Sequence, residues 1–135
     1  MIKGLLDVDD ARKARDAGAD GIIVSNHGGR QLDGAVAPLR VLPDFVAACP
    51  EIPVMMDCGV RRGTDVLKAL ALGARFAFVG RPFAYAAAIG GDAGVRHAID
   101  LLAAEIFRDM AMLGAVRVDE LDPRWLLRLT GRAPH

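Results

Sequence analysis

The sequence predicts an α/β fold that forms about half of a (β/α)₈ barrel, with about four parallel strands alternating with helices. Short apolar runs without polar alternation are typical of parallel strands that are buried on both faces. Stretches rich in Ala, Leu, Lys and Arg separate these runs and favour helix. In addition, a helix–glycine–strand pattern recurs at an offset of 55 residues, first over 10–24 and again over 65–79.

An open, doubly wound sheet is the alternative architecture for alternating strands and helices. A complete barrel contains eight strand–helix units in roughly 250 residues. Four strands in 135 residues amount to about half of that number. The internal repeat spans two units, which suits the quarters of a barrel better than an open sheet. We therefore expect residues 1–135 to be a single partial domain.

The first part of the chain contains two of these strand–helix units. A strand ends at residues 1–3, and the helix after it stops at Gly18, because glycine readily adopts the left-handed conformation of a C-cap. The apolar residues 21–25 predict the next strand. A second helix follows over 38–48, since Pro38 suits a first helical turn and two further prolines come after the end.

The next two strands precede a long helix. The apolar run at 54–57 predicts the third strand, and a helix that stops at Gly73 leads to the fourth strand at 75–79. From Ala93 to about Leu113, apolar residues recur three or four positions apart, which indicates an amphipathic helix.

The residues after this helix are predicted to form a tail. Residues 118–129 contain the only tryptophan, Trp125, which we expect to pack on the barrel wall. We expect residues 131–135 to be frayed.

Composition narrows the class of protein. Lysine plus arginine equals aspartate plus glutamate, at 17 each, so a general nucleic-acid binder is excluded. Every apolar run is shorter than the roughly 20 residues that cross a membrane. Cys49 and Cys58 make neither a metal motif nor a disulfide framework, and no metal site is expected. We expect a cytoplasmic protein; peripheral attachment of a longer protein to the inner face of a membrane stays compatible with the sequence.

Polar residues and glycines follow each predicted strand, on the face where barrels build active sites. Lys3 ends the first strand, where it either meets an anion or is an ordinary strand-end lysine. The block Ser25 to Asp33 follows the second strand. Within it, His27 can act as base or acid near neutral pH, and Arg30 can grip a carboxylate through two parallel hydrogen bonds.

Two glycine–arginine bends follow the third and fourth strands. The first runs from Asp57 to Thr64, and the second is Gly80-Arg81-Pro82. Free backbone N–H groups at a helix start, next to arginine, form an anion site. On the last two strands of a barrel, these bends occupy a common phosphate position. Spacing thus predicts a phosphate site beside a histidine and an arginine, and leaves the ligand unnamed.

These motifs resemble the FMN-dependent α-hydroxy-acid dehydrogenases and oxidases, which include L-lactate dehydrogenase, glycolate oxidase, mandelate dehydrogenase and lactate oxidase. The block Ser25-Asn26-His27-Gly28-Gly29-Arg30-Gln31-Leu32-Asp33 is the specific match. The similarity continues through 57–63, 79–82 and 94–98, and it covers nearly the whole chain. It implies the C-terminal half of the family's barrel, with FMN as cofactor.

The resemblance also implies a role for each site residue. His27 would take a proton from a small 2-hydroxy acid such as lactate or glycolate, and Arg30 would bind its carboxylate. Two electrons would pass from the C2 carbon of this acid to N5 of FMN and leave a 2-oxo acid. Lys3 would lie near the N1–C2 carbonyl edge of the flavin. The residues that would contact the flavin or hold its ribityl chain and phosphate are Ser25, Asp57, Cys58, Gly59, Val60, Arg61, Gly80 and Arg81.

This sequence departs from the family at one position and leaves part of its site unaccounted for. The family usually has Gly or another small residue where Cys58 stands, and we expect the thiol to be tolerated. The family places its substrate tyrosines, and the aspartate that orients the histidine, in the other half of the barrel. We therefore expect a fragment that needs this half for activity. The exposed sheet edges would favour association, and the intact enzyme is expected to be a homo-oligomer.

Two other interpretations remain open at this point. One is a different FMN or phosphate-binding barrel, such as a type 2 isopentenyl-diphosphate isomerase or a relative of inosine-monophosphate dehydrogenase. These share the glycine-rich phosphate loops, but are not expected to carry the block around His27. The other is a non-catalytic half-barrel that only binds FMN or phosphate, because a motif shows ancestry rather than activity.

Overall fold

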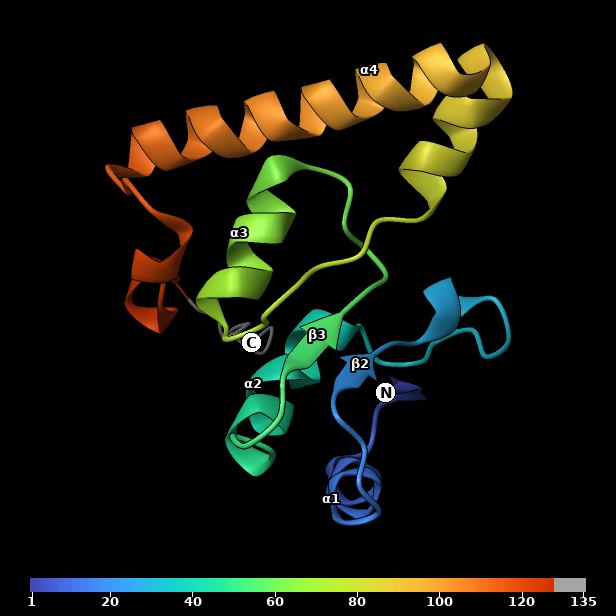
Figure 1. Ribbon diagram of the computed structural model, residues 1–135, viewed down its shortest axis with the longest axis vertical. Coiled ribbons are helices and arrows are strands. Elements are labelled where there is room, and N and C mark those ends of the chain that lie inside the picture. Colours follow the sequence, from blue (N-terminus) through green and yellow to red (C-terminus); the bar gives the residue numbers. More distant parts are fainter. Residues whose placement is uncertain (128–135) are drawn as a thin grey trace, which may run out of the picture.

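A parallel sheet forms the centre of the computed structural model, which describes residues 1–127. Its three strands are β1 (Ile2–Leu5), β2 (Ile22–Val24) and β3 (Val54–Met56), and they lie in the order β1-β2-β3. β2 and β3 are buried along their whole length, as expected of strands covered on both faces. Each strand is followed by a helix, so the chain folds as part of a (β/α)₈ barrel (Figure 1).

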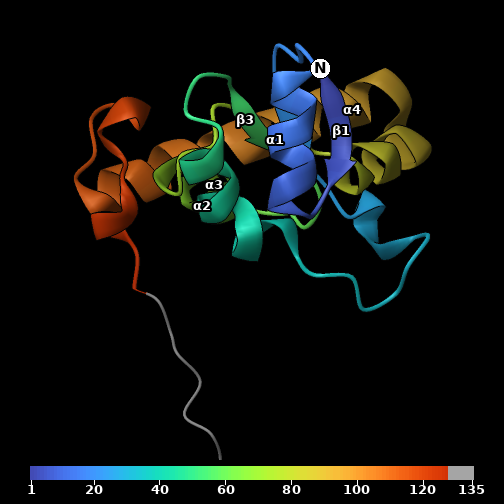
Figure 2. The same cartoon turned by 90° about the horizontal axis from the view of Figure 1, so that it is seen from below.

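Two helices lie side by side against the sheet (Figure 2). α1 (Val8–Asp16) begins after Asp7, whose carboxylate accepts hydrogen bonds from the backbone N–H groups of the first helical turn. α2 (Pro38–Ala48) begins at the predicted proline and contacts β2 and β3. Phe45 on α2 is completely buried, and the core between these helices and the sheet also contains Ile22, Val24, Leu42 and Met56.

The predicted fourth strand at 75–79 is reduced to a single bridge between Ala77 and Met56. The backbone still runs parallel to β3, because Arg75 N–H donates to Val54 O at 2.8 Å and Phe78 N–H donates to Met56 O at 2.8 Å. Within the described part of the chain, no strand pairs with the other edge of this segment. The segment lies where the fourth strand was predicted, but its regular strand pairing is limited to this bridge.

The long C-terminal helix starts earlier than predicted. α4 (Arg81–Leu113) begins directly after Gly80, whereas the sequence pattern placed the start at Ala93. Gly90 and Gly91 have non-helical backbone angles, with a φ of 54° at Gly91, so α4 consists of two helical segments that meet at a break. The predicted amphipathic helix corresponds to the segment after this break, which crosses α3 (Gly63–Ala71) (Figure 1).

A second, smaller core lies between α3, α4 and the tail. It contains Leu67 and Ala71 of α3 together with Ala115 and Leu121, and Trp125 packs against it as expected. The tail has two short 3₁₀ turns, Val118–Glu120 and Pro123–Trp125. The end of the predicted tail, at residues 128 and 129, and the predicted frayed residues 131–135 lie outside the described residues.

Candidate active site

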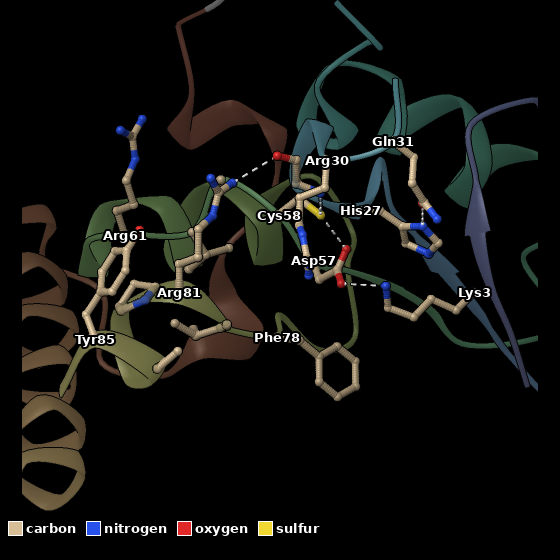
Figure 3. A pocket seen from close by; sticks show the side chains of 17 residues that line it. Lys3, His27, Arg30, Gln31, Asp57, Cys58, Arg61, Phe78, Arg81 and Tyr85 are labelled. Carbon is tan, nitrogen blue, oxygen red and sulfur yellow. Dashed lines mark hydrogen bonds and ion pairs between the residues drawn. The ribbon is translucent and has the colours of Figure 1, made fainter. Parts of the chain in front are cut away.

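An open cavity of about 1190 Å³ lies at the carboxyl ends of the strands (Figure 3). All the site residues predicted from the sequence line it except Ser25; they are Lys3, His27, Arg30, Asp57, Cys58, Gly59, Val60, Arg61, Gly80 and Arg81. These residues come from β1, from the loops after β2 and β3, and from the bend after the segment at 75–79, as the barrel prediction requires. Ser25 is 1% exposed and lies just beneath the cavity floor.

The loop after β2 carries the histidine in an unusual backbone conformation. His27 has a φ of 53° and begins a 3₁₀ turn (His27–Gly29) whose two glycines also have positive φ angles. The backbone N–H of His27 donates to Ser25 Oγ at 3.1 Å, which fixes the start of the turn. The ring atom Nδ1 contacts Oε1 of Gln31, one turn further on. Because an amide oxygen only accepts hydrogen bonds, this contact favours a proton on Nδ1 and a free lone pair on Nε2.

Lys3 and Asp57 form an ion pair across the floor of the cavity. Lys3 Nζ lies 2.8 Å from Asp57 Oδ2 and 3.0 Å from Ser25 Oγ. Burial raises the pKa of Asp57, but hydrogen bonds from Cys58, Lys3 and Ser25 outweigh it and hold this pKa below its ordinary value. Asp57 is therefore ionised at neutral pH, and Lys3 stays available at the cavity surface as a half-exposed cation.

Cys58 has a φ of 67°, a conformation that glycine adopts more easily than any other residue. Its thiol donates to Asp57 Oδ1 at 2.9 Å and accepts from the N–H of Gly28 at 3.0 Å. The thiol thus has hydrogen-bond partners on both sides, which is a physical reason for it to be tolerated where smaller residues are usual.

Carboxylates of the chain accept hydrogen bonds from most of the backbone N–H groups at the start of α3, where an anion site was predicted. The N–H groups of Arg61 and Arg62 donate to Asp65 Oδ2 at 3.0 and 3.1 Å, and Gly63 N–H donates to Glu105 Oε2 at 2.8 Å. Among the described residues, the N–H of Thr64 donates to no partner, so the start of α3 offers fewer free donors than its backbone alone would. The capping carboxylates come from one turn later and from α4.

Further free donors lie at Gly59 and Gly80, one in each glycine–arginine bend. Within the described residues, the N–H groups of Gly59 and Gly80 donate no hydrogen bond. Arg30, Arg61 and Arg81 form no ion pair with any described carboxylate. Three unpaired guanidinium groups and free amides around one cavity are the donor set that a phosphate and a carboxylate require. The residues present therefore fit a phosphorylated cofactor beside an acidic substrate.

Sequence reasoning missed several lining residues, among them Gln31, Phe78 and Tyr85. Tyr85 follows Arg81 by four positions, which places both on one helix face, so the i,i+4 spacing could have found it. Gln31 stands four positions after His27 and was likewise within reach of the pattern. No sequence signal pointed to the exposed Phe78.

A match to a family model identifies the family of this chain. Residues 1–128 match the model described as FMN-dependent dehydrogenase. The chain belongs to the FMN-dependent dehydrogenase family. The relatives that it matches include oxidases and dehydrogenases of hydroxy acids.

Curated relatives and solved structures agree with this family. The chain is 49% identical over 127 residues to an L-lactate oxidase of Nostoc sp. (strain PCC 7120), covering 93% of this chain and 35% of the relative. It is 51% identical over 122 residues to a peroxisomal (S)-2-hydroxyacid oxidase of Arabidopsis thaliana, covering 90% and 34%. An oxidised active mutant of (S)-mandelate dehydrogenase superimposes with a TM-score of 0.89 at 46% identity, covering 92% and 35%.

The chain thus spans about a third of the length of the FMN-dependent dehydrogenases that it matches. Across residues 1–127, no helix combines the length and the apolar composition needed to cross a bilayer. Matched family members include a peroxisomal oxidase and a mandelate dehydrogenase described as a monotopic membrane protein, so the cytoplasmic location stays a prediction.

Proposed function

We propose that this chain provides the base, the substrate carboxylate site and most of the FMN site of an enzyme that oxidises an L-2-hydroxy acid to the 2-oxo acid. The observation that carries the proposal is the grouping of His27, Arg30 and both glycine–arginine bends around one cavity. A lactate-like or glycolate-like acid is the proposed substrate, because the relatives include a lactate oxidase and a 2-hydroxyacid oxidase.

His27 is the proposed base. The contact of Nδ1 with Gln31 leaves Nε2 to accept the substrate proton, and the ring lines the cavity directly. Arg30 stands three positions further along the same loop and is exposed to the cavity, with donors free for the carboxylate of the acid. One loop would therefore hold the acid group and the base in a fixed relation.

The floor and the bends would hold the cofactor. FMN, when bound, supplies an acceptor for the two electrons that leave the hydroxy acid. Lys3 offers a cation at the floor, where it would stabilise negative charge on a reduced ring. The amides of Gly59 and Gly80, with Arg61 and Arg81, would bind the phosphate, while Asp57, Cys58 and Val60 would line the ribityl chain and Ser25 would support the ring from below.

Turnover is proposed to require further polypeptide. The relatives are about three times as long as the matched segment, and the cavity is open on the side away from the sheet. We also propose that the complete enzyme is a homo-oligomer in the cytoplasm, with attachment to the inner membrane face as the variant suggested by the monotopic relative.

Complementation tests this function. The chain would be co-expressed with the unmatched part of the Nostoc L-lactate oxidase, and flavin content and lactate oxidation would be measured. We expect His27→Ala to lower turnover by at least about 10³-fold and to keep the flavin, because only the base is lost. His97→Ala is the matched control, since His97 is an exposed histidine on α4 outside the cavity.

The same experiment separates the alternative of a non-catalytic binding module. In that case the complex would hold flavin, and neither histidine variant would change lactate oxidation. Turnover that survives His27→Ala would contradict the proposed role of the base.

A further inference from the structure

The peptide groups around Gly28 are held by the bend after β3 and by the start of α4. The N–H of Gly28 donates to Cys58 Sγ at 3.0 Å, and Asn26 Oδ1 from the same loop accepts from this N–H at 2.9 Å. The carbonyl oxygen of Gly28 accepts from Arg81 Nη2 at 3.1 Å. Gly28 thus joins the loop after β2 to the bend after β3 and to the start of α4.

Glycine at position 28 suits this arrangement. Its φ is 71°, and a Cβ atom built on this residue would lie 2.9 Å from Nη2 of Arg81. The guanidinium therefore occupies the space that a side chain would fill. Close packing against the backbone, together with the hydrogen bond to the carbonyl, restricts how far the loop can move relative to Arg81.

The contact between Cys58 and Gly28 requires a strained backbone conformation at Cys58. Cys58 keeps its thiol in place with a φ of 67°, where glycine would fit without strain. The thiol is a part-buried group with a second bond to Asp57 at 2.9 Å, so its position is set independently of Gly28. A strained residue persists where its side chain contributes something that glycine cannot, and here that is the link between Asp57 and the His27 loop.

Arg81 has donors left for a second partner. A guanidinium carries five N–H donors, and the hydrogen bond to Gly28 uses one. Its remaining donors lie at the cavity beside Gly80, whose N–H donates to no described residue. An anion bound at this bend would therefore contact the same guanidinium that holds Gly28.

We propose that Cys58 and Arg81 are positioning residues that hold the His27–Arg30 loop through Gly28, and that an anion bound at Gly80 and Arg81 stiffens this loop. The role of this loop in catalysis rests on the proposed function, whereas the hydrogen bonds that hold Gly28 do not depend on it. An anion that fixes the guanidinium reduces the freedom of the loop, and a loop already held gives the anion a more ordered partner. The effect is reciprocal, as linkage requires.

Amide proton exchange of Gly28 and Gly29, measured by NMR on the 135-residue chain, tests the hold. The variants are Cys58→Gly, which removes the thiol and relieves the positive φ, and Cys58→Ser, which keeps a group that donates and accepts. We expect exchange to be about threefold faster in C58G, because Asn26 retains one bond to the same N–H. Wild-type rates should return in C58S.

Inorganic phosphate is the probe for the coupling. Saturating phosphate should slow exchange at Gly28 and Gly29 in the wild-type chain by about threefold. Gly18 is the internal reference, since it also has a positive φ and a backbone-bonded N–H but lies at the end of α1. Its rate should not change in any variant or with phosphate.

Three results would overturn the proposal. They are unchanged exchange in C58G, failure of C58S to restore it, and phosphate that shifts the Gly80 amide signal without slowing Gly28. Absence of phosphate binding would contradict the coupling and also the proposed cofactor site, while the two Cys58 variants would still decide whether the thiol holds the loop. Turnover that survives in His27→Ala would contradict the proposed base and would leave the hydrogen bonds to Gly28 untouched, so this failure can be told apart from a failure of the hold.

Discussion

Lys3 on β1 and Asp57 after β3 meet across β2, with Lys3 Nζ 2.8 Å from Asp57 Oδ2. Parallel strands bring residues that are 54 positions apart in the sequence to one edge of the sheet. The hydroxyl of Ser25, at the end of β2, accepts a hydrogen bond from the same lysine at 3.0 Å. The ion pair therefore ties together all three strands beneath the cavity.

Replacing Lys3 should change how stability depends on pH. The pKa of Asp57 is held below its ordinary value of 3.8, so ionised Asp57 stabilises the fold above about pH 4, and this contribution is lost as the pH falls through the folded-state pKa. Lys3→Met removes one of the groups that lower this pKa. We expect the pKa of Asp57 to rise and the loss of stability on acidification to become smaller.

A carboxyl NMR titration of Asp57, with urea unfolding at pH 7 and pH 3, measures both effects. Lys13→Met is the control, because Lys13 forms an exposed pair with Asp10 at 2.9 Å, away from the cavity. An Asp57 pKa that is unchanged in K3M would contradict the assignment of this shift.

Alanine at positions 28 and 29 should separate backbone strain from contact with Arg81. Gly28 and Gly29 both have a φ of 71°, so each substitution should destabilise the fold by about 1 kcal/mol. Only at Gly28 would the new Cβ displace the guanidinium of Arg81, whereas nothing lies within 4 Å at Gly29. We expect phosphate affinity, measured by calorimetry, to fall about fivefold in G28A and to change little in G29A. Equal affinities in the two variants would argue against the contact.

Gly63 lies in close contact with the backbone of α4. A Cβ at this position would lie 2.6 Å from the backbone nitrogen of Ile106, and backbone cannot yield as a side-chain end can. We expect Gly63→Ala to destabilise the fold by about 2–3 kcal/mol in urea unfolding. Gly90→Ala is the matched control, because its Cβ would meet nothing within 4 Å, and it should change stability by less than about 0.5 kcal/mol.

The free energy of unfolding should fall when a buried phenylalanine is removed and change little when an exposed one is removed. Phe45 is 0% exposed between α2 and the sheet, so Phe45→Ala should cost about 3–5 kcal/mol through lost burial and a residual cavity. Phe107 is 78% exposed on α4, and Phe107→Ala should stay within about 0.5 kcal/mol. Similar losses in both variants, measured by urea unfolding, would show that α4 is covered in solution.

Local patterns in the sequence predicted most of the fold. The start of α2 at Pro38, the buried runs of β2 and β3, and the amphipathic residues after Gly91 all follow from propensity and spacing within a few residues. The segment at 75–79 has the same apolar pattern as these strands. It forms a single bridge to β3, so an apolar pattern alone does not determine how regular the strand pairing becomes.

The candidate site was predictable in its members and not in its contacts. Barrel logic placed His27, Arg30 and both bends on one face, since all follow strands that run in the same direction. The donation from Gly63 N–H to Glu105 spans 42 positions, and the donation from Arg81 to the carbonyl of Gly28 spans 53. Such pairs depend on three-dimensional packing. No spacing rule could therefore have shown that Glu105 accepts from the start of α3, or that Arg81 donates to the histidine loop.

The break at Gly90 and Gly91 brings the two segments of α4 into backbone contact, because a Cβ at Gly94 would clash with the carbonyl group of Ala86. One inserted residue turns the helix beyond it by about 100°. An insertion between Gly91 and Gly94 would therefore carry a side chain into this contact. The inner segment, which brings Arg81 and Tyr85 to the cavity, thus limits changes of length in the outer segment.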